Sequence, residues 1–324
     1  MIKHSIINIV FISDNGYALP TGVAINSLRI NRKKDIVYDI YLLCNKISDD
    51  NKQRFSRLAE EQFNIKIIEV EGNKLFNNLT KSYSKVTTTS LYKFLISDIL
   101  PELDKVIYID GDVIIQSDLQ SLFATDISNY YAAVVKDGPR KKVLNGGKKH
   151  FFSAEPTYFN SGMMVLNLKL LREENASEKL IDYRLTGYNY FMDQDAFNIV
   201  FRKRVKYLPY QYNLLLHILT PFWEMNSIEQ ISEYYDIPKV KTKEQYFDEA
   251  KIIHFTFDKP WKYYDIPQSE KWMEYYRSSS FSDIHLARGT YLTNYHNSKS
   301  YLIGRIITYI PRKIKFLIKS LREG

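Results

Sequence analysis

Two aspartates separated by a single glycine carry the clearest chemical signal in the chain. Asp110 and Asp112 flank Gly111 directly after the apolar run at residues 106–109. Two carboxylates at this spacing can face one divalent cation, and the glycine lets the backbone approach closely. An Asp-Gly pair is also a common turn. Apolar residues continue at 113–115, so the two acids interrupt an otherwise apolar element. Unpaired charge is costly there, and this context favours a metal site.

A histidine and a lysine follow a second apolar run near the end of the chain. His254 comes directly after residues 252–253, and Lys259 follows five positions later. A lone histidine is usually structural, but together with Asp110 and Asp112 its imidazole completes a mixed N and O ligand set that suits manganese. Lys259 either neutralises a phosphate or is an ordinary surface lysine.

Three polar residues, Asp193, Gln194 and Asp195, precede the helical pattern at residues 196–200. An aspartate at such a place is often only a helix N-cap. Carboxylate and carboxamide groups at a helix start can also hold sugar hydroxyls and stabilise an oxocarbenium-like centre. The residues alone leave both interpretations open. The polar stretch at 159–162 is a weaker signal, because it is compatible with a bulge at the start of a strand.

The elements that must position these residues alternate between strands and helices. Strands are predicted at residues 6–12, 36–43, 65–70, 105–109, 132–135, 159–168, 205–208 and 251–255. Helices are predicted at residues 22–30, 48–60, 88–100, 169–185 and 196–202. Such alternation predicts an α/β fold with a mostly parallel sheet, whose ligands bind beyond the carboxyl ends of the strands. A mobile loop is expected at 139–152, and a tyrosine-rich irregular region follows residue 208.

Length and composition indicate a globular enzyme of ordinary make-up. The chain has 324 residues, 45% of them hydrophobic and 25% charged, and we expect a catalytic domain at 1–262, a helical extension at 263–300 and a tail at 301–324. The single cysteine, Cys44, cannot form an internal disulfide, and no signal segment is evident, so a cytoplasmic setting is expected. No apolar stretch reaches roughly the 18 residues of a membrane span.

The net charge of +8 is concentrated in the tail, where six basic residues and one acid supply +5. This distribution argues against a nucleic-acid partner and for contact with an anionic surface. Apolar residues recur at helical spacing on both sides of Pro311, interleaved with the basic ones. The pattern is typical of a helix in an anionic membrane interface, with a helix docked on the catalytic domain as the alternative. We expect a peripheral location at the inner face of the membrane.

In their order along the chain, these motifs resemble glycosyltransferase family 8, the retaining enzymes that include bacterial lipooligosaccharide galactosyltransferases and, more distantly, glycogenin. The resemblance spans roughly residues 6–262. The matching segments lie at residues 9–17, 23–31, 92–94, 110–112, 159–162, 193–195 and 254–261, with Asn213 before the last of them.

The resemblance implies a GT-A-like fold, in which one Rossmann-like mixed sheet is flanked by helices. It further implies transfer of glucose or galactose from a UDP-sugar to a glycan or lipid-linked glycan, with retention. Mn²⁺, or alternatively Mg²⁺, would be bound by Asp110, Asp112 and His254 and would bridge the UDP phosphates.

The resemblance also assigns roles around the donor. Asp14 would bond the uracil edge, Tyr17 would stack on the base, and Lys259 would meet the diphosphate beside Asp110. The groups expected to hold the donor sugar are Lys93, Asp137, Asn160, Asp193 and Gln194. Of these, Gln194 and Asp193 are the expected catalytic groups, with Gln194 nearest the reacting face.

The sequence departs from the family pattern at one segment, and two other functions remain as alternatives. Relatives commonly have a glycine and a longer spacing between this histidine and the Lys-Pro-Trp, whereas residues 256–258 fill the gap here. A sugar nucleotidyltransferase would need a Gly-rich basic loop after the first strand, and residues 14–17 are not such a loop. A non-catalytic glycan- or membrane-binding protein is disfavoured by the retained acids and His254.

Overall fold

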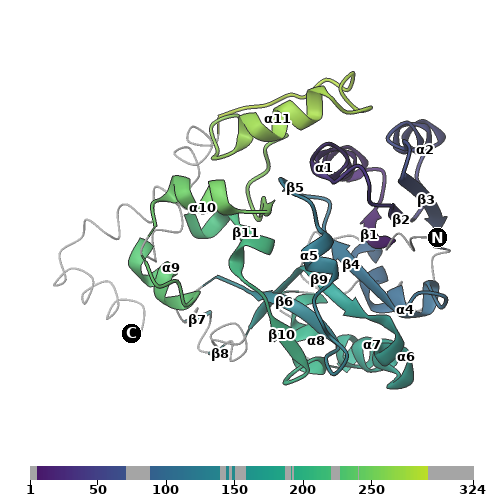
Figure 1. The fold of residues 1–324 in the computed structure, drawn as a ribbon, viewed down its shortest axis with the longest axis vertical. Coiled ribbons are helices and arrows are strands. Elements are labelled where there is room, and N and C mark those ends of the chain that lie inside the picture. Colours follow the sequence, from purple (N-terminus) through teal and green to yellow (C-terminus); the bar gives the residue numbers. More distant parts are fainter. Residues whose placement is uncertain are drawn as a thin grey trace, which may run out of the picture.

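The computed structural model describes residues 6–70, 88–138, 144–145, 148–149, 158–186, 191, 193–219, 227–239 and 241–290. Its centre is a seven-stranded sheet with the order β10-β6-β9-β4-β1-β2-β3 (Figure 1). The strands are β1 (Ile7–Ser13), β2 (Tyr38–Cys44), β3 (Phe63–Glu69), β4 (Lys105–Ile109), β6 (Ala132–Lys136), β9 (Phe159–Asn167) and β10 (Val205–Tyr207). All pairs are parallel except those of β9, which runs antiparallel to β4 and β6. The predicted α/β fold with a mostly parallel sheet is confirmed.

Helices cover both faces of this sheet. Successive residues of β1 alternate between two hydrophobic clusters, with Ile9 and Phe11 in one and Val10 and Ile12 in the other, as the two-residue period of a strand requires. On the first face lie α1 (Ala18–Asn31), α2 (Asp49–Ser56) and α5 (Gln120–Phe123). On the second lie η1 (Thr88–Leu95), α4 (Ile96–Ile99), α6 (Leu168–Glu173), α7 (Ala176–Thr186) and α8 (Asp193–Val200).

A second, three-stranded sheet meets the carboxyl end of β4. It consists of β11 (Leu214–Leu215), β12 (Ile252–His254) and β5 (Val113–Ile115), with β5 antiparallel to β12. The expectation that Asp110 and Asp112 interrupt one apolar element is therefore corrected, because the strands before and after them belong to different sheets. In this register His254 pairs with Val113, which sets the histidine beside Asp112.

The region expected to be irregular contains helices. It includes η2 (Tyr210–Tyr212), η3 (Leu216–Leu219), α9 (Ile228–Tyr234) and α10 (Lys243–Glu249). Ser227 with Gln230 and Thr242 with Gln245 form capping boxes that start the two α-helices, a local signal visible in the sequence. Of the loop expected at 139–152, only the backbone hairpin β7 (Leu144–Asn145) and β8 (Lys148–Lys149) is described. The tail at 301–324 lies outside the described residues.

The described segment after residue 262 packs on the first helix of the chain. Helix α11 (Ser269–Arg277) lies against α1 (Figure 1), and the Asn26 amide donates to the Tyr275 carbonyl at 2.8 Å and to Ser278 Oγ at 3.0 Å. The Phe281 ring fills the notch left by Gly22 in α1. Among the described helices, none has the length and apolarity needed to cross a bilayer.

Replacing Gly22 by alanine is expected to lower the free energy of unfolding by about 1–3 kcal/mol, because the new methyl group overpacks a filled site. A Cβ at this position would stand 2.1 Å from Cε2 of Phe281. Urea unfolding measures the loss. In a Phe281→Leu background the same substitution should lose less stability, and equal losses in both backgrounds would count against this packing account.

Candidate active site

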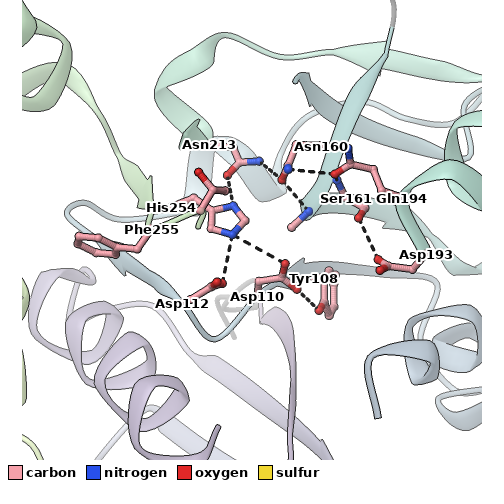
Figure 2. A network of polar contacts seen from close by, with 12 residues as sticks. Tyr108, Asp110, Asp112, Asn160, Ser161, Asp193, Gln194, Asn213, His254 and Phe255 are labelled. Carbon is pink, nitrogen blue, oxygen red and sulfur yellow. Dashed lines mark hydrogen bonds and ion pairs between the residues drawn. The ribbon is translucent and has the colours of Figure 1, made fainter. Parts of the chain in front are cut away.

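Two carboxylates and an imidazole converge where β4 ends. The ligand atoms of Asp110, Asp112 and His254 all lie within 4.8 Å of one another. His254 Nε2 is 3.1 Å from Asp112 Oδ1 and 3.9 Å from Asp110 Oδ2 (Figure 2). The Phe255 N–H donates to the Asp112 carbonyl at 2.9 Å, so backbone pairing between the two chain segments holds the histidine next to the acids.

The surroundings of these three side chains fit a bound divalent cation. Two carboxylates and one imidazole are a donor set suited to Mn²⁺. Gly162 borders the group, since a Cβ there would lie 2.3 Å from Cε1 of His254 and 2.7 Å from Oδ2 of Asp110. Glycine, which has no side chain, therefore leaves room at position 162 for the side chains of His254 and Asp110.

Asn213 orients the histidine ring. The Asn213 amide nitrogen donates to Asn160 Oδ1 at 2.9 Å, so its oxygen is the atom that faces His254 Nδ1 at 3.1 Å. The Nδ1–H of His254 therefore donates to Asn213. This bond leaves Nε2 as the ring nitrogen that faces the two acids, the arrangement that outer hydrogen bonds commonly impose on metal-binding histidines.

Two lysines neutralise the acids. Lys93 Nζ lies 3.0 Å from Asp110 Oδ1 and 2.8 Å from Asp193 Oδ2, while Lys259 Nζ contacts Asp112 Oδ2 at 2.5 Å. Burial alone would lower the pKa of Lys93, but the Asp110 and Asp193 carboxylates outweigh it and hold the pKa above its usual value. Burial would likewise raise the pKa of Asp112, yet Lys259 and His254 hold it well below its usual range. The described ion pairs thus keep Lys93 and Asp112 charged.

A chain of carboxamides extends from the histidine to α8. Gln194 Oε1 accepts from Asn160 Nδ2 at 3.0 Å and from the Ser161 N–H at 3.2 Å (Figure 2). Its Nε2 donates to Asp137 Oδ2 at 3.1 Å. These bonds fix both the position and the flip state of the Gln194 side chain. Ser161 Oγ donates to Asp193 at 3.0 Å.

The two aspartates at the start of α8 differ in their surroundings. Asp193 faces Lys93 and Ser161, whereas Asp195 accepts from the Tyr158 hydroxyl and from the Phe191 N–H, both at 2.7 Å. Asp195 therefore stabilises the helix start, and Asp193 points into the polar network.

A pocket of about 600 Å³ opens beside this network, within the range of roughly 300–1,000 Å³ that small-molecule sites occupy. On one side Asp14 Oδ1 accepts from the Tyr17 N–H at 3.0 Å. Tyr17 is 39% exposed as a residue, and its ring meets the Trp261 ring edge-on at 5.9 Å. The lining includes Asp14, Tyr17, Lys93, Asp110, Asp112, Asp193 and Lys259.

All residues predicted from the sequence thus meet in one place. Seven line the pocket, and the others, Asp137, Asn160, Gln194 and His254, belong to the adjoining hydrogen-bonded network. Sequence reasoning assigned no role to Tyr108, whose hydroxyl donates to Asp110 Oδ1. The two-residue period of β4 is the signal that places Tyr108 on the same side as Asp110.

The Glycosyl transferase family 8 model matches residues 8–265, and the chain belongs to this family. A putative glycosyltransferase of Haemophilus influenzae is 31% identical over 213 residues, which are 64% of this chain and 62% of that protein. A lipopolysaccharide 1,2-glucosyltransferase of Escherichia coli is 26% identical over 271 residues, which are 82% of this chain and 76% of the relative. The chain thus spans less than two thirds of the first relative's length.

Solved structures share the fold. The apo structure of the bifunctional glycosyltransferase WbbM aligns with a TM-score of 0.69 at 23% identity, covering 86% of this chain and 51% of that one. The galactosyltransferase LgtC, in complex with donor and acceptor sugar analogs, aligns with a TM-score of 0.64 at 21% identity, covering 84% and 96%. These likenesses confirm the GT-A-like α/β architecture.

Proposed function

We propose that this chain transfers a hexose, glucose or galactose, from a UDP-sugar to a hydroxyl of a glycan or lipid-linked glycan, with retention and with Mn²⁺ or Mg²⁺ bound. The observation that carries the proposal is the convergence of Asp110, Asp112 and His254 beside a pocket that the two aspartates line together with Lys259. Relatives named as lipopolysaccharide 1,2-glucosyltransferase and 1,3-galactosyltransferase support a hexose as the transferred group.

The metal ligands and Lys259 act on the leaving group. Asp110, Asp112 and His254 would hold the cation, which when bound supplies Lewis-acid stabilisation of the charge on departing UDP. Lys259 places a second positive charge at the same end of the pocket, 2.5 Å from Asp112. Its ammonium is within reach of a diphosphate held at these acids, and charge-assisted hydrogen bonds of this kind are strong.

The nucleotide end of the pocket carries Asp14 and Tyr17. Asp14 has a carboxylate to accept from the uracil N–H, and the partly exposed Tyr17 ring offers a face for the base. The edge-on contact with Trp261 fixes the orientation of the tyrosine. These two residues account for the choice of a uridine nucleotide.

The donor sugar would lie against Asp193, Gln194 and their partners. A carboxamide is a poor nucleophile, so a same-face route through a short-lived oxocarbenium-like state is favoured over a covalent intermediate. The Gln194 oxygen, held by Asn160 and Ser161, presents a fixed dipole to the developing charge. Lys93, bonded to Asp193, holds that carboxylate in place, and Asp137 would meet sugar hydroxyls.

A UDP-release screen tests this function. The 324-residue protein is incubated with a panel of UDP-sugars, with and without Mn²⁺, and free UDP is measured. Release that needs the metal and prefers a UDP-hexose is the expected result. Release of pyrophosphate from a sugar phosphate and UTP would instead support a sugar nucleotidyltransferase, and inactivity with every donor would support a non-catalytic binding protein.

We also propose that residues 301–324 bind an anionic membrane at its inner face, where a lipid-linked acceptor would be found. Six basic residues interleave with the apolar stripe of this segment, and each adds about 1 kcal/mol near such a surface. Deleting 301–324 should abolish sedimentation with anionic vesicles and spare hydrolysis of the soluble donor. Added salt should weaken vesicle binding of the intact protein. Loss of donor hydrolysis on deletion would show instead that the segment belongs to the catalytic fold.

A further inference from the structure

The turn between His254 and Lys259 holds Phe257 in an unfavourable backbone conformation. Its φ angle is 66°, and it is the sole aromatic among the described non-glycine residues with positive φ. The Asp258 N–H donates to the Thr256 carbonyl at 2.9 Å. A three-residue turn with a positive central φ is the rarer, strained form of the γ-turn, and a bulky side chain is disfavoured at its centre.

The Phe257 ring is also exposed. The exposed fraction of the Phe257 residue is 54%, so burial does not explain the choice of an apolar residue here. The ring stands edge-to-face on His217, with centroids 5.1 Å apart and planes at 79°. His217 is buried, and its Nδ1 shares a 2.6 Å hydrogen bond with Thr256 Oγ1, so the imidazole supports both the turn and the ring.

Neither conformation nor burial therefore favours phenylalanine at this position. The short segment between His254 and Lys259 requires a tight turn, but glycine would make that turn without strain. Strained residues persist where the surrounding structure holds them, and they cluster at ligand-binding sites. Glycine could supply the backbone conformation of Phe257 but not its aromatic ring.

Phe257 is connected to both ends of the proposed donor site, to one through the chain and to the other through His217. Along the chain it lies three residues after His254 and two before Lys259, next to the groups proposed to hold the diphosphate. His217, which contacts the Phe257 ring, lies near Gly138 at the sugar end of the site. A Cβ on Gly138 would lie 3.6 Å from His217 Nε2. Gly138 follows Asp137, which accepts from Gln194 on the sugar side.

We propose that the Phe257 ring, supported by His217, is the platform for the acceptor sugar. The inference rests on the proposed function, because a transfer that retains configuration by a same-face route brings the acceptor hydroxyl in beside the departing diphosphate. The acceptor ring must then lie next to the groups that hold the phosphates. One face of a pyranose carries mainly C–H groups, and such a face packs on an aromatic ring.

Saturation-transfer NMR with methyl β-D-glucopyranoside and methyl β-D-galactopyranoside tests the platform. UDP and Mg²⁺ are present, since Mn²⁺ would broaden the signals. The wild-type protein should transfer saturation mainly to the protons of one sugar face. Phe257→Gly should weaken binding of the better probe by roughly three- to tenfold, the range expected for one aromatic contact. Phe257→Tyr should restore it.

Matched substitutions at Lys203 distinguish the effect of losing the Phe257 ring from the effect of relieving the backbone conformation. Lys203 is exposed and has a φ of 63°, so Lys203→Gly relieves a similar conformation without touching the site. At both positions the glycine variant should unfold at a higher temperature than the alanine variant, and only the Phe257 variants should lose glycoside binding.

Three results would overturn the platform: unchanged glycoside binding by Phe257→Gly, no binding of either probe by wild-type protein that binds UDP, or equal loss in Phe257→Tyr. A failure of the proposed function is recognised separately, as absence of metal-stimulated UDP release by the wild-type protein. If the protein releases UDP but its glycoside binding does not depend on Phe257, the platform is refuted and the proposed function stands.

Discussion

Asp112→Asn is expected to lower Mn²⁺-stimulated UDP release by at least about a hundredfold, because the substitution removes a charged ligand and keeps the shape of the side chain. The Asp112 carboxylate faces His254 at 3.1 Å and Lys259 at 2.5 Å. An asparagine leaves that lysine without its carboxylate partner and leaves the proposed cation with one fewer negative charge. Asp110→Asn should have a similar effect. Steady-state UDP release over a range of Mn²⁺ concentrations measures both.

A matched substitution tests whether the loss of UDP release is specific to the proposed metal ligands. Asp104→Asn changes the same functional group just before β4, at the opposite end of the strand, where the Asp104 side chain is 78% exposed. This variant should keep wild-type release, and all three variants should give the circular dichroism of the folded protein. Wild-type activity in both Asp110→Asn and Asp112→Asn would end the metal-site proposal.

Gln194→Ala is expected to lower turnover by roughly a hundred- to a thousandfold, the effect of removing one preorganised dipole from a charged transition state. UDP affinity should stay within about twofold of the wild-type value, because the carboxamide acts on the reacting sugar and not on the nucleotide. Initial rates with saturating donor give the first quantity, and calorimetric titration of UDP with Mn²⁺ gives the second.

Asn198→Ala is the control for this change. Asn198 lies one helical turn further along α8, and its side chain bonds the Phe159 backbone and the Gln194 carbonyl. The variant loosens the contact between α8 and β9 but keeps the Gln194 carboxamide, so its turnover should fall far less. A Gln194→Ala protein that merely binds UDP more weakly, with unchanged turnover at saturation, would refute the assigned role.

Local patterns account for what the sequence predicted well. The strand before Asp110 and the strand ending at His254 are short apolar runs, which the sequence pattern identifies, although the two strands belong to different sheets. The helices α9 and α10 were missed because tyrosine-rich composition was given more weight than their capping boxes. The separation of β4 and β5 into two sheets was missed because both read as buried apolar strands, and periodicity does not identify a strand's partners.

The hydrogen-bonded partners of the site could not be predicted from spacing. Lys93 and Asp193 are 100 residues apart in sequence, and Lys259 and Asp112 are 147 apart. Only the resemblance to family 8 brought these residues into one site. The strained turn at Phe257 was missed for a related reason, because the sequence reveals the shortened segment but not the backbone conformation that closes it.

Calorimetric titration of UDP tests the central claim most directly, because it reports on the metal and the nucleotide together and needs no acceptor. In the wild-type protein, Mn²⁺ should tighten UDP binding by at least about tenfold, since a cation held by Asp110, Asp112 and His254 would bridge to the phosphates. In His254→Ala most of this gain should disappear, while the weak metal-free affinity stays the same. Equal UDP affinity of the wild-type protein with and without Mn²⁺ would contradict a metal-dependent UDP-sugar site.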